Sequence, residues 1–241
     1  MTVQPRRLAS KSAVAAALAA LGAASWSETA AAQSDVTIFA GGKLDVADSA
    51  YAGAAVGLPG SVDGKGWAVR GSIYTGGYEY ESGATTIDAD FTGGQGGLVY
   101  RFGAGATWGS VGAGYRYVDT DLSPADPGNR RDGGQGEMIV SLDGGHVSGP
   151  WRVDWYGSYG FRLVDYDALG SLTPTVGSPA RARAGPEVAA DGDSNYSAYH
   201  IGPVVGFKIG DRAEFQISAG LSDGDDRGSD GYVRVGFYRS F

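Results

Sequence analysis

Hydrophobic and polar residues alternate with a period of two along most of this chain. The clearest example runs from Trp151 to Leu163, where every second residue is apolar or glycine and the residues between them are mostly polar. Successive side chains of a strand point to opposite faces, so this pattern predicts a β-strand with one apolar and one polar face. Its apolar face carries Trp151 near one end and Phe161 near the other. Aromatic rings prefer the headgroup level of a bilayer, so this arrangement is typical of a membrane-spanning strand.

The same alternation recurs along the chain and gives eleven predicted strands. They cover 36–43, 50–58, 66–80, 87–102, 106–119, 134–147, 151–164, 180–190, 196–209, 212–222 and 231–241. A bacterial single-chain barrel has an even number of strands, with both chain ends in the periplasm. We therefore predict a twelfth strand at 168–176, which Pro174 weakens. Ten strands are the alternative if the segment before residue 190 is mostly loop.

These strands predict an all-β fold, a transmembrane antiparallel up-and-down β-barrel of about 12 strands. A soluble sandwich also alternates, with its apolar face inward. The polar faces here are rich in Gly and Ser, which suits a narrow barrel interior. Short connections also alternate with longer polar ones, such as Thr120–Gly133 and Asp223–Asp230. Short periplasmic turns and longer outer loops mark outer-membrane barrels, so we favour the membrane barrel.

Both ends of the chain support this interpretation. Residues 1–32 have the pattern of a secretory signal peptide, with basic residues, an apolar run at Ala13–Ala24 and small residues at Ala30–Ala32. The run is shorter than the roughly 20 residues of a membrane-spanning helix. The chain ends on Phe241 after an alternating segment, which resembles the C-terminal signal of outer-membrane barrels. We expect a signal peptide at 1–32, a barrel at 33–241 and an outer-membrane location.

Composition excludes several classes of protein. The chain has 241 residues, 42 of them Gly, no Cys, two His and a formal net charge of −8. Without Cys there is no disulfide scaffold, zinc ribbon or Cys nucleophile. The negative charge argues against nucleic acid as a partner, because phosphate binding needs a basic face.

Motifs for catalysis or cofactor binding are weak. The run Gly93–Gly97 lies within a strand pattern with no helix after it, whereas a phosphate cradle needs a strand-to-helix turn. The acidic loop 223–230 lacks the spacing of a calcium loop, and a solvated surface loop is the favoured interpretation. We predict a protein that is not an enzyme and holds no cofactor or metal. The alternative is a hydrolase centred on His200, which the pattern places in the barrel interior near the outer end of its strand.

The polar faces supply the candidate binding residues. Charged residues of both signs lie there, Asp88 and Asp90 among them. Mixed charges allow a salt-bridged plug that stiffens a closed barrel, which we favour. The functional alternative is a sugar path in which tyrosine rings stack on pyranose rings and charges bind hydroxyl groups. Its candidate glucan contacts are Tyr74, Tyr78, Tyr156, Arg116, Arg152 and Arg183.

Three stretches resemble the cellulose biosynthesis protein BcsS family. They are Tyr115–Pro127 with its Leu-Ser-Pro-x-Asp-Pro motif, Ala182–Glu187 with Gly-Pro-Glu, and Gly220 through the Asp223–Gly231 loop into the final strand. The resemblance covers most of 35–241, and 165–180 departs from it. It implies an accessory role in making or exporting cellulose, and it carries over no catalytic residue.

The sequence thus predicts a non-enzymatic outer-membrane barrel accessory to bacterial cellulose biosynthesis or export. Its expected partners are outer-membrane lipid and either nascent cellulose or components of the cellulose synthase complex. The alternative is a small general channel, or a structural or adhesive barrel unrelated to cellulose.

Overall fold

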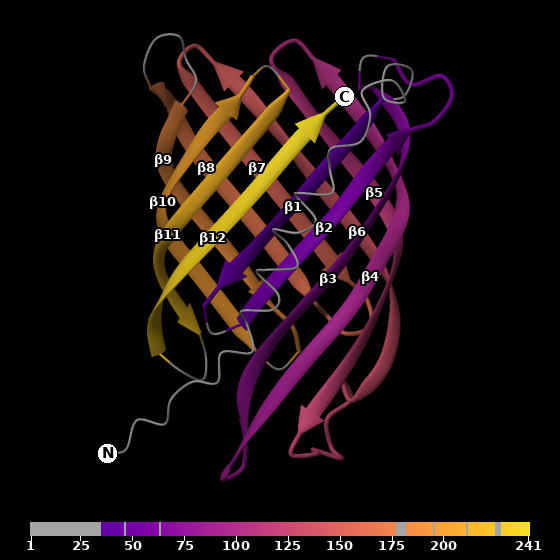
Figure 1. The fold of residues 1–241 in the computed structure, drawn as a ribbon, viewed down its shortest axis with the longest axis vertical. Coiled ribbons are helices and arrows are strands. Elements are labelled where there is room, and N and C mark those ends of the chain that lie inside the picture. Colours follow the sequence, from indigo (N-terminus) through magenta and orange to yellow (C-terminus); the bar gives the residue numbers. More distant parts are fainter. Residues whose placement is uncertain are drawn as a thin grey trace.

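The computed structural model describes residues 35–45, 47–62, 64–176, 182–194, 196–210, 212–224 and 228–241. In these ranges the chain forms twelve antiparallel strands, each paired with its neighbours in sequence, and β1 pairs with β12 to close the barrel (Figure 1). The strands are β1 (Val36–Leu44), β2 (Ala47–Gly57), β3 (Gly66–Ser82), β4 (Thr85–Ala104), β5 (Thr107–Ser123), β6 (Gly133–Ser148), β7 (Trp151–Gly160), β8 (Tyr166–Val176), β9 (Ala182–Gly192), β10 (Ser197–Ile209), β11 (Ala213–Gly224) and β12 (Gly228–Ser240).

The prediction of a twelve-stranded up-and-down barrel is confirmed. The segment predicted as a weak twelfth strand is β8, so the ten-stranded alternative is wrong. Its pairing with β9 is interrupted between Ser171 and Thr175, where Pro174 has no N–H to donate. The predicted signal peptide at 1–32 lies outside the described residues.

The outer surface of the barrel is apolar, with aromatic rings toward both ends of the strands. Trp67 and Tyr100 meet edge to face, with ring centroids 5.3 Å apart, near the end of the barrel that holds the C-terminus. Toward the other end, Tyr159 and Phe161 meet in the same way at 5.4 Å. On β7, the exposed Val153 lies between the exposed rings of Trp151 and Tyr159. An apolar surface of this extent, bordered by aromatic residues, is typical of a barrel that crosses a bilayer. The described residues include no helix of the length and hydropathy needed to cross a membrane.

Glycines allow aromatic rings to lie flat against neighbouring strands. Three residues on β1, β2 and β3 show this inside the barrel, each with its ring over the glycine directly opposite in the register. The pairs are Phe39 over Gly53, Tyr51 over Gly41 and Tyr74 over Gly93. A Cβ on any of these glycines would collide with the ring. The high glycine content therefore has a packing role in the sheet.

The end of the barrel opposite the C-terminus is here called the mouth. Its connections are shorter than the sequence suggests, because β5 runs to Ser123, β6 begins at Gly133, and residues 223 and 224 pair with 229 and 228. The polar segments extend the strands instead, and β3, β4 and β5 reach far past their neighbours at the lower end of Figure 1. Asp88 and Asp90 lie exposed on the outside of this extension, so their predicted place in the interior is wrong.

Candidate functional site

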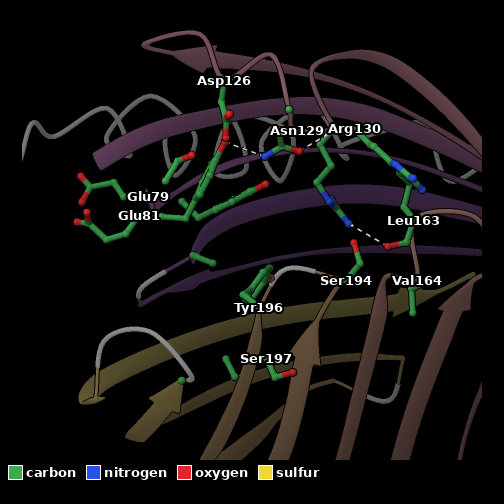
Figure 2. A pocket seen from close by; sticks show the side chains of 18 of the residues that line it. Glu79, Glu81, Asp126, Asn129, Arg130, Leu163, Val164, Ser194, Tyr196 and Ser197 are labelled. Carbon is green, nitrogen blue, oxygen red and sulfur yellow. Dashed lines mark hydrogen bonds between the residues drawn. The ribbon is translucent and has the colours of Figure 1, made fainter. Parts of the chain in front are cut away.

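A cavity of about 1200 Å³ lies at the mouth (Figure 2). It is bounded by β3, by the β5–β6 loop (residues 124–132), and by the β7–β8 and β9–β10 connections (residues 161–165 and 193–196). Aromatic and hydrogen-bonding side chains line most of it. Its lining includes Tyr78, Glu79, Tyr80, Glu81, Asp126, Asn129, Arg130, Arg131, Arg162 and Tyr196.

Tyr78 and Tyr196 meet across the mouth. Tyr78 lies on β3 and Tyr196 in the β9–β10 connection, which stand on opposite sides of a twelve-stranded barrel. Their ring centroids are 5.6 Å apart with an angle of 31° between the planes. Tyr80 lies next to Tyr78, with ring centroids 6.1 Å apart. The rings of these residues form an aromatic row, Tyr80–Tyr78–Tyr196, that reaches from one wall of the mouth to the other.

Arg131 ties the β5–β6 loop to two other connections. Its guanidinium forms ion pairs with Asp165 in the β7–β8 connection and, at 3.0 Å, with Asp193 in the β9–β10 connection. It also donates to the carbonyl of Leu163 at 3.4 Å. Burial acts to lower the pKa of Arg131, but the Asp165 and Asp193 carboxylates outweigh it and raise that pKa above its ordinary value. Three connections around the mouth are therefore joined through one side chain.

Tyr80 fixes the same loop to β3. Its hydroxyl donates to Asp126 Oδ2 at 2.8 Å and accepts from Asn129 Nδ2 at 2.7 Å. Asn129 Oδ1 in turn accepts from the backbone N–H of Arg131 at 2.9 Å. The loop that the sequence marked as long and polar is thus folded over the mouth and hydrogen-bonded in place.

The β7–β8 connection is held in a strained conformation. Val164 has a φ of 60°, which is rare for a β-branched residue. Glu137 on β6 accepts hydrogen bonds from the backbone N–H groups of Arg162 and Leu163 at 3.1 and 3.0 Å. Arg116 binds the same carboxylate, and it also pairs with Asp165 at 2.8 Å. Strain of this kind persists where several surrounding contacts hold the backbone in place, and it is concentrated at functional sites.

A buried charged cluster lies beside the mouth and includes His200. Its Nε2 is 2.7 Å from Asp191 Oδ1, and its Nδ1 is 3.4 Å from Asp45 Oδ2. Lys43 pairs with both carboxylates, at 2.7 Å to Asp191 and 3.2 Å to Asp45. His200 is 2% exposed, and among the described residues its Nδ1 has no hydrogen-bond partner. The predicted interior position of His200 is confirmed. A general base needs its nitrogen within reach of a nucleophile or substrate, and this geometry instead suits an ion-pair network.

Two of the predicted glucan contacts, Arg152 and Arg183, lie deeper in the interior and share acidic partners. Arg152 is 2.8 Å from Asp154 and 3.0 Å from Glu214. Arg183 is 3.0 Å from Asp154 and 2.5 Å from Glu214. Arg183 also donates to Thr173 Oγ1 at 3.1 Å. These guanidinium groups are paired with carboxylates, as the plug interpretation expects.

The other predicted contacts are dispersed. Tyr74 donates to the backbone carbonyl of Tyr117 at 3.3 Å while its ring covers Gly93, and Tyr156 lies on the inward face of β7. Arg116 takes part in the ion pairs at the mouth, and Tyr78 lines the cavity. The structure therefore places only one of the six predicted residues in the cavity lining.

Sequence reasoning missed Tyr196 and Arg131, which do most to join the walls of the mouth. Both lie in connections, where no alternation shows which way a side chain points. The aromatic Tyr196 directly after the polar run Asp191–Asn195 was the one available signal.

Among the described residues no group of three or more His, Asp or Glu side chains is arranged to hold a metal ion. The acidic loop 223–230 lies partly outside the described residues.

The fold and the site together define a membrane-spanning β-barrel with an ion-paired interior and a mouth bridged by side chains. The chain belongs to the family described as cellulose biosynthesis protein BcsS, whose model matches residues 37–241. No match is found among curated proteins.

Several solved barrels share the general architecture at low similarity. The KdgM porin is 12% identical with a TM-score of 0.49, over 85% of this chain and 99% of that chain. The translocator domain of autotransporter NalP from Neisseria meningitidis is 12% identical with a TM-score of 0.48, over 96% and 98%. LpxR from Salmonella typhimurium is 10% identical with a TM-score of 0.40, over 86% and 100%.

Proposed function

We propose that this chain is a non-enzymatic outer-membrane barrel that assists bacterial cellulose biosynthesis or export. The observation that carries the proposal is membership of the cellulose biosynthesis protein BcsS family over residues 37–241. The apolar outer surface with its aromatic borders supports a bilayer as the surrounding medium, with outer-membrane lipid as the contact.

The orientation follows from the chain ends. Val36 at the start of β1 and Phe241 at the C-terminus lie together, because the N–H of Phe241 donates to the carbonyl of Val36 at 2.9 Å. In outer-membrane barrels this end faces the periplasm. The mouth, with its cavity and extended strands, then faces outward, where nascent cellulose or a component of the cellulose synthase complex would meet it.

A scaffold at the outer surface accounts for the interior better than a wide channel does. The contacts of Tyr78 with Tyr196 and of Arg131 with Asp193 cross the mouth. Below them, Arg152 and Arg183 occupy interior space with their carboxylate partners. An extended glucan chain passing through would have to displace both layers.

The test is cellulose output in a strain that lacks the gene, with polymer measured separately outside the cell and in the periplasm. We expect less polymer outside and restoration by the wild-type gene. Polymer retained in the periplasm would assign the protein to export, and reduced polymer in both compartments would assign it to synthesis. Normal output in both compartments would refute the proposal.

A further inference from the structure

We propose that the mouth cavity is a carbohydrate-binding site that takes a neutral glucan chain, with the rings of Tyr78 and Tyr196 as its stacking surface. The inference rests on the proposed function and names the site and ligand class through which that function would act. The ligand meets the protein at the mouth and does not enter the ion-paired interior below.

The shape and lining of the cavity suit a sugar chain. Its volume of about 1200 Å³ is somewhat larger than the usual range for small-molecule sites, roughly 300–1000 Å³, and so leaves room for several sugar units. A β-linked glucan is a flat ribbon, with apolar C–H faces and hydroxyl groups around its edges. The aromatic row Tyr80–Tyr78–Tyr196 offers flat apolar surfaces to the C–H faces of the sugar rings. Side chains such as Asn129 and Arg130 offer hydrogen bonds to the hydroxyl groups.

The charge of the lining points to a neutral ligand. Three arginines line the cavity, Arg130, Arg131 and Arg162. Their charge is offset by Asp126 in the lining and by Asp165 and Asp193, which pair with Arg131. Glu79 and Glu81 lie on the outward face of β3, opposite Asp88 and Thr86 in the register, and do not enter this balance. A site for an anionic polymer needs an excess of basic groups, which this cavity does not offer.

Two polar atoms of cavity-lining residues lack partners. The hydroxyl of Tyr78 and the Nε of Arg131 are buried and have no hydrogen-bond partner among the described residues. A buried polar group without a partner costs roughly 1–3 kcal/mol, and such groups are rare in native proteins. A ligand rich in hydroxyl groups supplies donors and acceptors next to both residues.

Three of the other predicted glucan contacts already bind or cover other groups of the protein. The ring of Tyr74 lies on Gly93, while Arg152 and Arg183 bind Asp154 and Glu214. Using them would break ion pairs in the interior, whereas binding at the mouth leaves these pairs intact. The cavity is therefore the better place for a ligand that arrives from outside.

The experiment is calorimetric titration of the purified barrel, folded in detergent, with cellohexaose. Maltohexaose and oligogalacturonate serve as comparison ligands. The variants are Tyr196→Ala, Tyr196→Phe, Tyr78→Ala and, as a matched control deeper in the interior, Tyr156→Ala. Migration of unheated samples on denaturing gels confirms that each variant is folded, and Tyr78→Ala replaces Tyr196→Ala if the latter fails to fold.

We expect saturable binding of cellohexaose by the wild type. Tyr196→Ala should weaken it roughly tenfold, because the stacking surface is lost. Tyr196→Phe keeps the ring, and Tyr156→Ala lies away from the cavity, so both should bind like the wild type. Weaker binding of maltohexaose, whose helical form presents no flat ribbon, would support a site shaped for an extended chain.

Three results would overturn the inference. They are no saturable binding of cellohexaose by the folded wild type, equal weakening by Tyr156→Ala and Tyr196→Ala, or tighter binding of oligogalacturonate than of cellohexaose. The cellulose assay in the deletion strain separates this inference from the proposed function. A cellulose defect without binding refutes only the site, and binding without a cellulose defect refutes only the role in cellulose production.

Discussion

The ring of Tyr196 lies 5.6 Å from the ring of Tyr78, although the two residues stand on opposite sides of the barrel. The contact spans the mouth at the level where Arg131 joins three connections. Among the described residues, the mouth is therefore bridged by a few side-chain contacts between different walls. Single substitutions are therefore expected to change its permeability.

Removal of the Arg131 side chain should open the mouth. Arg131→Ala loses the ion pairs to Asp165 and Asp193 and frees the β5–β6 loop from two connections. We expect single-channel conductance in planar bilayers to rise severalfold over that of the wild type. The matched control is Arg130→Ala, which removes the same charge from a neighbour that also lines the cavity. Equal conductance for Arg131→Ala and the wild type would show that the constriction lies elsewhere.

Loss of Glu214 should destabilise the barrel. This carboxylate pairs with Arg152 at 3.0 Å and with Arg183 at 2.5 Å, so Glu214→Gln leaves two guanidinium groups in the interior with one shared carboxylate, Asp154. We expect the free energy of unfolding to fall by about 2 kcal/mol or more, as for other broken buried pairs. Urea titration in detergent measures the change. Asp88→Asn removes a charge from the exposed strand extension and should leave the unfolding midpoint unchanged.

Alkaline pH should weaken the wild type more than a variant without the Tyr196 hydroxyl. Burial, reinforced by the Asp191 and Asp193 carboxylates, raises the pKa of Tyr196 well above its usual value. A pKa raised by folding adds stability that is complete below the unfolded pKa, about 10, and is lost as pH rises through the folded pKa. The Tm of the wild type should therefore fall more steeply above about pH 10 than that of Tyr196→Phe. Parallel Tm curves over this range would contradict the expected linkage.

The close approach of β10 and β11 should make Gly202 intolerant of a side chain. A Cβ there would collide with the carbonyl oxygen of Ala219 and lie 2.8 Å from Gly220 Cα, both of which are backbone atoms that cannot rotate away. Gly202→Ala should cost about 1–3 kcal/mol in unfolding free energy, the usual range for overpacking. Gly236→Ala is the control, since nothing lies within 4 Å of its Cβ position. Equal unfolding midpoints for the two variants would refute this account.

The strands were predictable because alternation is a local signal. The alternation within Trp151–Leu163 alone is enough to assign its apolar and polar faces, and the same is true of the segments that form β10 and β11. Even the weak strand at 168–176 followed from the requirement for an even number of strands. Asp88 and Asp90 were placed wrongly because their strand continues past the bilayer, where both faces are wet and polarity no longer distinguishes inside from outside.

The site was far less predictable, because it depends on contacts between connections. Tyr78 was recognised from the inward face of its strand, but its partner Tyr196 lies more than a hundred residues later in a turn. Arg131 similarly pairs with Asp165 and Asp193, and no periodicity relates these positions. Barrel closure brings them together only after every strand register is set.

Several rings lie on opposing glycines, such as Tyr51 on Gly41 and Tyr74 on Gly93. These contacts favour one strand register over the alternatives. A strand that slips along its neighbour carries its ring away from the bare backbone position and onto a residue with a side chain. Each glycine therefore stabilises the one register in which the ring of the adjacent strand lies opposite it. Among relatives of this chain, a ring and its opposing glycine should be inherited or lost together, and this joint substitution would reveal strand neighbours without a structure.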